Sequence, residues 1–165
     1  MHLALLSDTH GNVARTVRAI AALKAFHPDH VIHCGDIGSA AVLTELAAGF
    51  ADPETPITCV FGNVDTYADD LFSPVGYLDL PGRLATLHLA GHAIAVLHGD
   101  DLRRLDGLIA SQNYDYLFTG HTHLAADDRH GRTRVINPGA LHRAQQPSCA
   151  ILNLATDDLT FLPIA

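Results

Sequence analysis

The sequence predicts an α/β fold in which two β-sheets pack together with helices on their outer faces. In the N-terminal half, short apolar runs alternate with helical patterns, which is typical of parallel strands. In the C-terminal half, strand patterns dominate and indicate more antiparallel pairing. A chain of 165 residues that is 48% hydrophobic can bury one ordinary core, so we expect a single domain over residues 1–165.

Strands and helices alternate in the first sixty residues. Residues 3–6 are uninterruptedly apolar, which predicts a strand buried on both faces. Asn12 is placed to cap the helix that follows, and Pro28 ends it, because the residue before proline disfavours helix. The expected elements are a strand at 3–6, a helix over 12–26, a strand at 31–34, a helix over 39–49 and a strand at 57–61.

Residues 65–82 mix Asp, Pro, Gly, Tyr and Phe without a period, which predicts a long loop. The runs 83–89 and 92–97 flank Ala90-Gly91 and predict a β-hairpin. The remaining expected elements are a helix over 102–110 and strands at 116–119, 133–137, 149–154 and 159–162.

Composition excludes several classes of protein. A chain with this apolar content and only 17% charged residues is not a disordered one. No apolar run approaches the roughly 20 residues that a membrane-spanning helix needs, so no integral membrane protein is expected. The net charge of −8 disfavours binding to long nucleic acid but leaves a small nucleotide open. Three cysteines in apolar stretches indicate buried free thiols and a reducing, cytoplasmic compartment.

Seven polar residues follow five of the apolar runs: Asp8, His10, Asp36, Asn63, His98, His121 and His123. The carboxyl ends of strands form the edge at which open α/β sheets bind ligands. Taken singly, each residue has an ordinary alternative as a helix cap, a turn residue or a satisfied histidine. Together, their placement predicts one site.

The residue types suit two metal ions. Carboxylate, imidazole and amide ligands fit Mn²⁺, Fe, Zn²⁺ or Ni²⁺, with no sign of a thiolate site. Asp36 is isolated, and its two carboxylate oxygens could bridge two ions. Two divalent ions carry four positive charges in total. The carboxylates of Asp8 and Asp36 and a bridging hydroxide neutralise three of them, so one positive charge remains. We therefore expect an anionic substrate such as a phosphate ester.

The ordered motifs resemble those of the calcineurin-like metallophosphoesterases over roughly residues 1–140. These motifs are Asp8-Thr9-His10, Gly35-Asp36, Gly62-Asn63, His98 and Gly120-His121-Thr122-His123, with Asn137-Pro138-Gly139 resembling a segment of the small single-domain phosphodiesterase branch. The resemblance implies a four-layer α/β/β/α sandwich of two mixed β-sheets flanked by helices, with a dinuclear metal site. It implies one metal held by Asp8, His10, Asp36 and His123, and another held by Asp36, Asn63, His98 and His121.

Two positions depart from the wider family. Val64 stands where many members carry a histidine that protonates the leaving group, which favours the small phosphodiesterase branch. Asp100 stands where the segment after His98 often reads Gly-His, so contacts to substrate near the second metal differ, and Asp100 is itself a candidate proton donor. We interpret Asp65 as a turn residue, with support of the ligands as the alternative, and His33 as an ordinary strand residue.

Two functions from different classes follow. The first is a phosphodiesterase that uses two divalent ions, with Mn preferred and Fe, Zn, Ni or Mg possible, on a small phosphodiester or nucleotide-like substrate. In it, Asp8, Asp36, Asn63 and His98 carry the catalytic site. The second is a protein-binding scaffold, since the same fold serves as a subunit of the retromer coat. The complete ligand set favours the enzyme, and a homo-oligomer remains possible.

Overall fold

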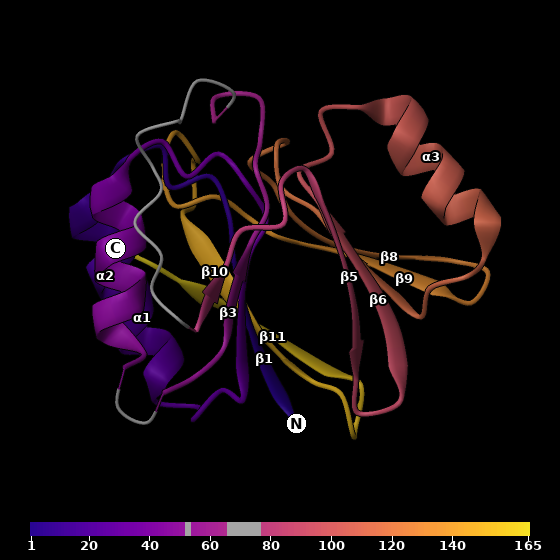
Figure 1. Cartoon of the computed structure of the whole chain (residues 1–165), viewed down its shortest axis with the longest axis horizontal. Helices are drawn as coiled ribbons and strands as arrows, with labels where there is room; N and C mark the ends of the chain where they lie inside the picture. The colour runs from indigo at the N-terminus through magenta and orange to yellow at the C-terminus, as the bar shows by residue number, and fades with distance from the viewer. Residues whose placement is uncertain (52–53, 66–76) are drawn as a thin grey trace.

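Two β-sheets pack face to face in the computed structural model, which describes residues 1–51, 54–65 and 77–165 (Figure 1). Helices cover the outer faces of both sheets, so the layers follow the order α/β/β/α. The predicted fold class is confirmed. The helices of the described residues are α1 (Val13–Lys24), α2 (Ala40–Gly49) and α3 (Leu102–Ser111). None of them is long and apolar enough to cross a membrane.

The first sheet has the strand order β11-β10-β1-β2-β3-β4. Its strands are β1 (His2–Leu6), β2 (His30–His33), β3 (Ile57–Cys59), β4 (Leu78–Asp79), β10 (Ser148–Asn153) and β11 (Asp158–Pro163). Strands β1 to β4 are parallel, whereas β10 and β11 return as an antiparallel hairpin beside β1. The carboxyl ends of β1, β2 and β3 therefore meet at one edge.

The second sheet has the strand order β5-β6-β7-β9-β8. Its strands are β5 (Leu84–Leu89), β6 (His92–Leu97), β7 (Tyr116–Phe118), β8 (Ala125–His130) and β9 (Thr133–Pro138). The three central strands are parallel, and β5 and β8 are antiparallel edges. Helix α3 connects β6 to β7 as a crossover, which parallel neighbours require.

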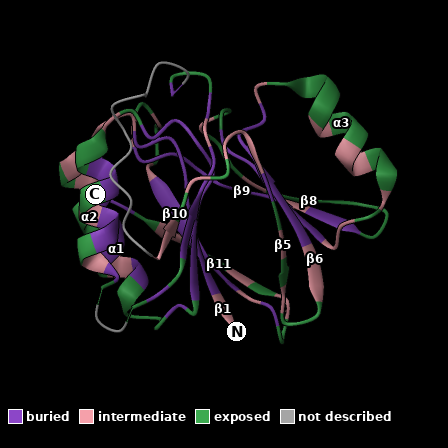
Figure 2. Cartoon of the chain, viewed as in Figure 1, coloured by how far each residue is buried: buried purple, intermediate pink, exposed green. Residues whose placement is uncertain are grey.

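Two apolar layers hold the molecule together. Leu3 and Leu5 of β1 lie between the sheets, against residues such as Phe118, while Ala4 and Leu6 face α1 and α2. The prediction that β1 is buried on both faces is therefore confirmed. Figure 2 shows buried residues concentrated between the sheets and beneath α1 and α2, whereas α3 has no fully buried residue.

Several predicted elements need correction. Strand β3 ends at Cys59, earlier than predicted, because the chain leaves the sheet before Gly62. Strand β8 was not expected, because its AADDRH sequence is mostly exposed at a sheet edge and lacks apolar alternation. The predicted loop over 65–82 lies largely outside the described residues, but its end contains β4. The C-terminal half is more antiparallel than the N-terminal half, as predicted, although β6, β7 and β9 run parallel.

The three cysteines, Cys34, Cys59 and Cys149, are free and buried, as predicted. Burial raises the pKa of each thiol, which leaves them protonated and unreactive at neutral pH.

Candidate metal centre

Loops from both sheets meet at the edge formed by the carboxyl ends of the parallel strands. The loops after β1 and β2 are joined by backbone hydrogen bonds, from Asp8 N to Gly35 O (3.0 Å) and from His10 N to Asp36 O (2.9 Å). In the second sheet, Gly120 N donates to His98 O (2.9 Å), which joins the loops after β6 and β7. Backbone hydrogen bonds thus join loops that carry predicted ligands, one pair of loops in each sheet.

The backbone of these loops is strained. Five of the predicted ligands have positive φ angles, which side-chain-bearing residues adopt rarely. They are Asp8 (53°), His10 (44°), Asp36 (54°), His121 (68°) and His123 (60°). Such strain persists where surrounding contacts impose it, and it gathers at functional sites. Here it turns side chains from separate strands toward one point.

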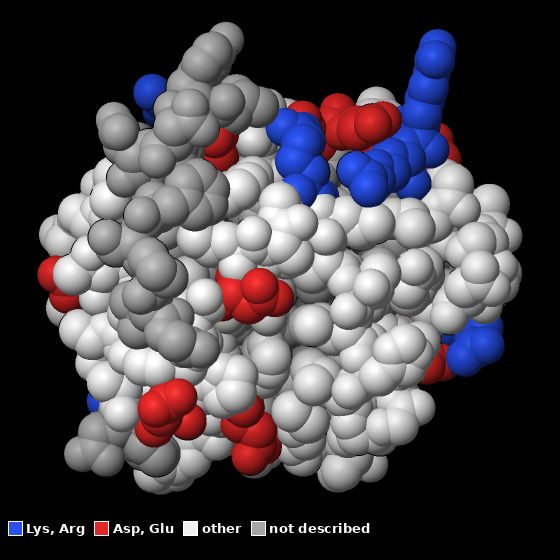
Figure 3. Space-filling view, viewed as in Figure 1, with Lys and Arg blue, Asp and Glu red and all other residues white. Residues whose placement is uncertain are grey.

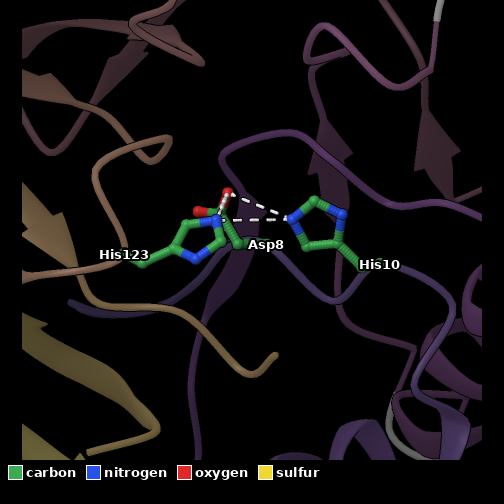
Figure 4. Close-up of side chains that lie close together, drawn as sticks. All are labelled: Asp8, His10 and His123. Carbon is green, nitrogen blue, oxygen red and sulfur yellow. Dashed lines mark hydrogen bonds and ion pairs between the residues drawn. The ribbon is translucent and has the colours of Figure 1, made fainter. Parts of the chain in front are cut away.

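The first ligand group consists of Asp8, His10 and His123 (Figure 4). Asp8 Oδ1 lies 3.2 Å from His123 Nε2 and 3.8 Å from His10 Nε2. The two histidine Nε2 atoms are 3.4 Å apart, so all three atoms point at a common space. Burial lowers the pKa of His10, against the opposing effect of Asp36 and Asp8, which favours the neutral ring that a metal ion needs.

The second ligand group consists of Asp8, Asp36 and His98. Asp36 Oδ2 lies 3.2 Å from His98 Nε2 and 3.5 Å from His10 Nε2, so one oxygen faces histidines of both groups. Its other oxygen accepts a hydrogen bond from Val64 N (3.0 Å). Burial opposes ionisation of Asp36, but the contacts with His98 and Val64 N outweigh it and lower the pKa of the carboxyl.

Two buried polar atoms in this centre have no hydrogen-bond partner among the described residues, Asp8 Oδ1 and His98 Nε2. Leaving such atoms unsatisfied costs about 1–3 kcal/mol each. His98 Nδ1 donates to Cys34 O at 2.9 Å, so Nε2 is the ring atom that faces the carboxylates. Burial opposes protonation of His98, but its contacts with Asp36 and Cys34 O outweigh this effect and raise its pKa. A positive charge beside these two carboxylates is therefore favoured, and a bound cation can supply it in place of the proton, so these residues fit the expected metal ions.

The other predicted ligands lie at the same edge. His121 donates its backbone N–H to Asp8 Oδ2 (3.1 Å), and its ring centroid is 5.1 Å from that of His98. Asn63 is exposed and directly precedes Val64, whose backbone binds Asp36. Asp100 is not in either ligand group and forms an ion pair with Arg83.

Residues 1–157 match the calcineurin-like phosphoesterase superfamily domain. The chain belongs to this superfamily. It is therefore a hydrolase of phosphoric ester bonds from a metal-dependent family, as the motifs predict.

Relatives and solved structures agree with this membership. The phosphoesterase is 27% identical to a phosphodiesterase of Methanocaldococcus jannaschii over 142 residues, which cover 84% of this chain and 83% of that protein. It is 28% identical to a probable metallophosphoesterase of Mycoplasma pneumoniae, with 95% and 94% covered. The structure of an archaeal phosphodiesterase has a TM-score of 0.83 at 23% identity, with 99% and 100% covered. Vacuolar Protein Sorting 29 from Cryptosporidium parvum has a TM-score of 0.66 at 16% identity, with 99% and 97% covered.

Asp65 supports the ligand loops of the phosphoesterase. Its carboxylate accepts backbone N–H bonds from Ile37 (3.1 Å), Gly38 (2.9 Å) and Gly62 (2.9 Å). These bonds tie the loop after Asp36 to the loop that carries Asn63. From the sequence, support of the ligands is the alternative role of Asp65, and these hydrogen bonds show that Asp65 does support the loops that carry them.

His33 is a strand residue, as predicted, but it also supports the loops of the candidate site. It is fully buried, with Nδ1 accepting from Gly35 N (3.2 Å) and Nε2 donating to Thr9 Oγ1 (3.0 Å). Thr9 Oγ1 in turn donates to Ile37 O (2.9 Å), so one imidazole joins the loops after β1 and β2. The sequence offered one signal for this role, since His33 lies three residues before the predicted ligand Asp36. Only the contacts in the structure show that His33 joins the two loops.

We expect His33 to make the metal-free phosphoesterase sensitive to acid. Burial lowers the pKa of His33 from 6.5 to about 4. At a pH between these two pKa values, His33 is protonated in the unfolded chain but neutral in the folded chain, so the unfolded chain binds one more proton. The free energy of unfolding should therefore fall by up to about 1.4 kcal/mol per pH unit as the pH decreases through this window.

Urea unfolding of chelator-treated protein between pH 4 and 7 measures this slope. His33→Gln should flatten it, while His88→Gln, at an exposed position on β5, should leave it unchanged. Equal slopes for wild type and His33→Gln would contradict the assignment.

Proposed function

We propose that this phosphoesterase is a single-domain phosphodiesterase that works with two divalent metal ions. The observation that carries the proposal is the position of Asp36 Oδ2, 3.2 Å from His98 Nε2 and 3.5 Å from His10 Nε2. One carboxylate oxygen that faces both histidines is suited to be shared between two ions. Two ions held there would supply a hydroxide as the nucleophile and would stabilise charge on the phosphate oxygens.

The proposed ligand sets follow the motifs. One ion is held by Asp8, His10, Asp36 and His123, and the other by Asp36, Asn63, His98 and His121. Asp8 Oδ1 also lies 3.9 Å from His98 Nε2, so Asp8 stands close to both groups. Mn is the proposed metal, with Fe, Zn, Ni or Mg as alternatives, because a mixed set of oxygen and nitrogen donors accepts all of these ions. A structural neighbour, Vps29 from Entamoeba histolytica, forms a complex with Zn²⁺.

A small phosphodiester is the proposed substrate class, and two features support it. Val64 has no proton to give to a leaving group, which disfavours monoesters with poor leaving groups. His123 also lines a groove of about 500 Å³, whose walls include Leu124, Pro147 and Phe161. A groove of this size beside the metal centre can receive an organic substituent of a diester.

Hydrolysis of bis(4-nitrophenyl) phosphate by protein loaded with Mn²⁺ tests the proposal, with 4-nitrophenyl phosphate as the monoester comparison. We expect turnover of the diester that stops on chelation and returns with Mn²⁺. Elemental analysis should find about two ions per chain. Absence of turnover at full metal loading would instead support the alternative function, a protein-binding scaffold. The Vps29 structures have the same fold as this chain.

A further inference from the structure

An ion pair stands at the rim of the metal centre. Arg83 directly precedes β5, and Asp100 lies two residues after the ligand His98. Arg83 Nη2 donates to Asp100 Oδ2, and Arg83 Nη1 donates to Gly62 O (3.3 Å). Gly62 immediately precedes Asn63, so the guanidinium joins the loop of one predicted ligand to the loop of another. Figure 3 shows that Lys or Arg side chains and Asp or Glu side chains lie close together along the top of the molecule in that view.

The guanidinium retains donors after these two contacts. An arginine side chain carries five N–H groups, and the described contacts use two of them. The Arg83 side chain is 37% exposed and that of Asp100 is 20% exposed, so the pair is held in place but open to solvent. The remaining N–H groups are available to an anion that enters beside Asn63 and His98.

We propose that Arg83 binds the phosphate group of the substrate and that Asp100 is the residue that positions it. This inference rests on the proposed phosphodiesterase function. A planar guanidinium matches two phosphate oxygens in geometry and remains charged at any working pH. In a chain of net charge −8, a cation at the rim also offsets the repulsion that an anionic substrate meets.

The ion pair explains what Asp100 does at the rim of the centre. The carboxylate accepts a hydrogen bond from Arg83 and so restrains a long side chain that would otherwise sample many rotamers. An ion-paired carboxylate is an acceptor without a proton to donate. Asp100 therefore acts through Arg83 and not as the proton donor.

Binding of inorganic phosphate to protein loaded with Mn²⁺ tests the role of Arg83, measured by calorimetry and as competitive inhibition of diester hydrolysis. Arg83→Met should weaken phosphate binding about 10- to 100-fold, the size expected for a charge-assisted hydrogen bond. Arg83→Lys should recover part of the lost phosphate affinity, because lysine keeps the positive charge but lacks the planar set of N–H donors of a guanidinium. The KM for diester should rise more than kcat falls, and metal content should match that of the wild type.

A double-mutant cycle tests the role of Asp100. Asp100→Asn should weaken phosphate binding by about 3- to 10-fold in the wild type and have no further effect in Arg83→Met, because the two residues act as one unit. Arg132→Met is the matched control. Arg132 forms a similar ion pair with Asp115, which directly precedes β7 and so lies at the amino end of that strand, away from the candidate metal centre. This control should bind phosphate as the wild type does.

The outcomes separate this inference from the proposed function. A wild type that binds metal but neither phosphate nor diester overturns the proposed function itself. An active wild type with Arg83→Met binding phosphate within twofold of it overturns only the role of Arg83. Loss of metal in Arg83→Met would also overturn it, because Arg83 would then support the ligand loops and not the substrate.

Discussion

Replacing Asp36 with alanine is expected to release metal from both positions and to lower kcat for diester hydrolysis by about 10²–10³-fold, the loss typical of removing one preorganised electrostatic group. Asp36 Oδ2 is the carboxylate oxygen that faces both His10 and His98. Its removal also takes the nearer of two carboxylates away from the buried His98 Nε2, which leaves only Asp8 Oδ1 at 3.9 Å. The effect should therefore reach both ligand groups and not one alone.

Elemental analysis after dialysis against a defined Mn²⁺ concentration measures the metal lost. Asp106→Ala on the exposed face of α3 changes the net charge equally and should keep two ions. Retention of two tightly bound ions by Asp36→Ala would show that Asp36 is not shared. Asp8, which belongs to both ligand groups, would then be the bridging candidate.

Replacing Val64 with histidine is expected to raise monoesterase activity by up to about 10²-fold, since a general acid contributes about 10²–10⁴-fold. Val64 is 42% exposed and its backbone N–H binds Asp36 Oδ1, so the residue lies next to the candidate centre and a larger side chain there need not enter the core. A histidine there keeps the backbone contact and adds a titratable N–H. Diesters with good leaving groups need this proton least and should gain little.

Values of kcat/KM are compared for bis(4-nitrophenyl) phosphate, for 4-nitrophenyl phosphate and for an alkyl phosphate, whose leaving group needs a proton. The gain in Val64→His should appear with the alkyl monoester. Val64→Gln is the control, because it is polar but does not titrate. A wild type that prefers the monoester, and loses that preference on Asp100→Asn, would overturn this argument and make Asp100 the proton donor.

Local patterns carry much of the fold. In β1, Leu3 and Leu5 face the second sheet while Ala4 and Leu6 face the helices, as an uninterrupted apolar run predicts. Asn12 caps α1 by accepting from Arg15 N (3.1 Å), again from a local signal. Strand β8 escaped prediction because an exposed edge strand is stabilised by backbone pairing with β9, which leaves no apolar period in its sequence.

The sequence by itself determined which residues could bind metal, because ligand chemistry and its position after apolar runs are both local properties. The tertiary structure decided what surrounds them. His33 reaches Thr9 across 24 positions, and Arg83 reaches Gly62 and Asp100 across 21 and 17. The first contact exists because β1 and β2 are parallel neighbours in one sheet, and the contact between Arg83 and Gly62 exists because the two sheets pack together. Hydrogen bonds and ion pairs depend on distance in space, and no spacing along the chain encodes that distance.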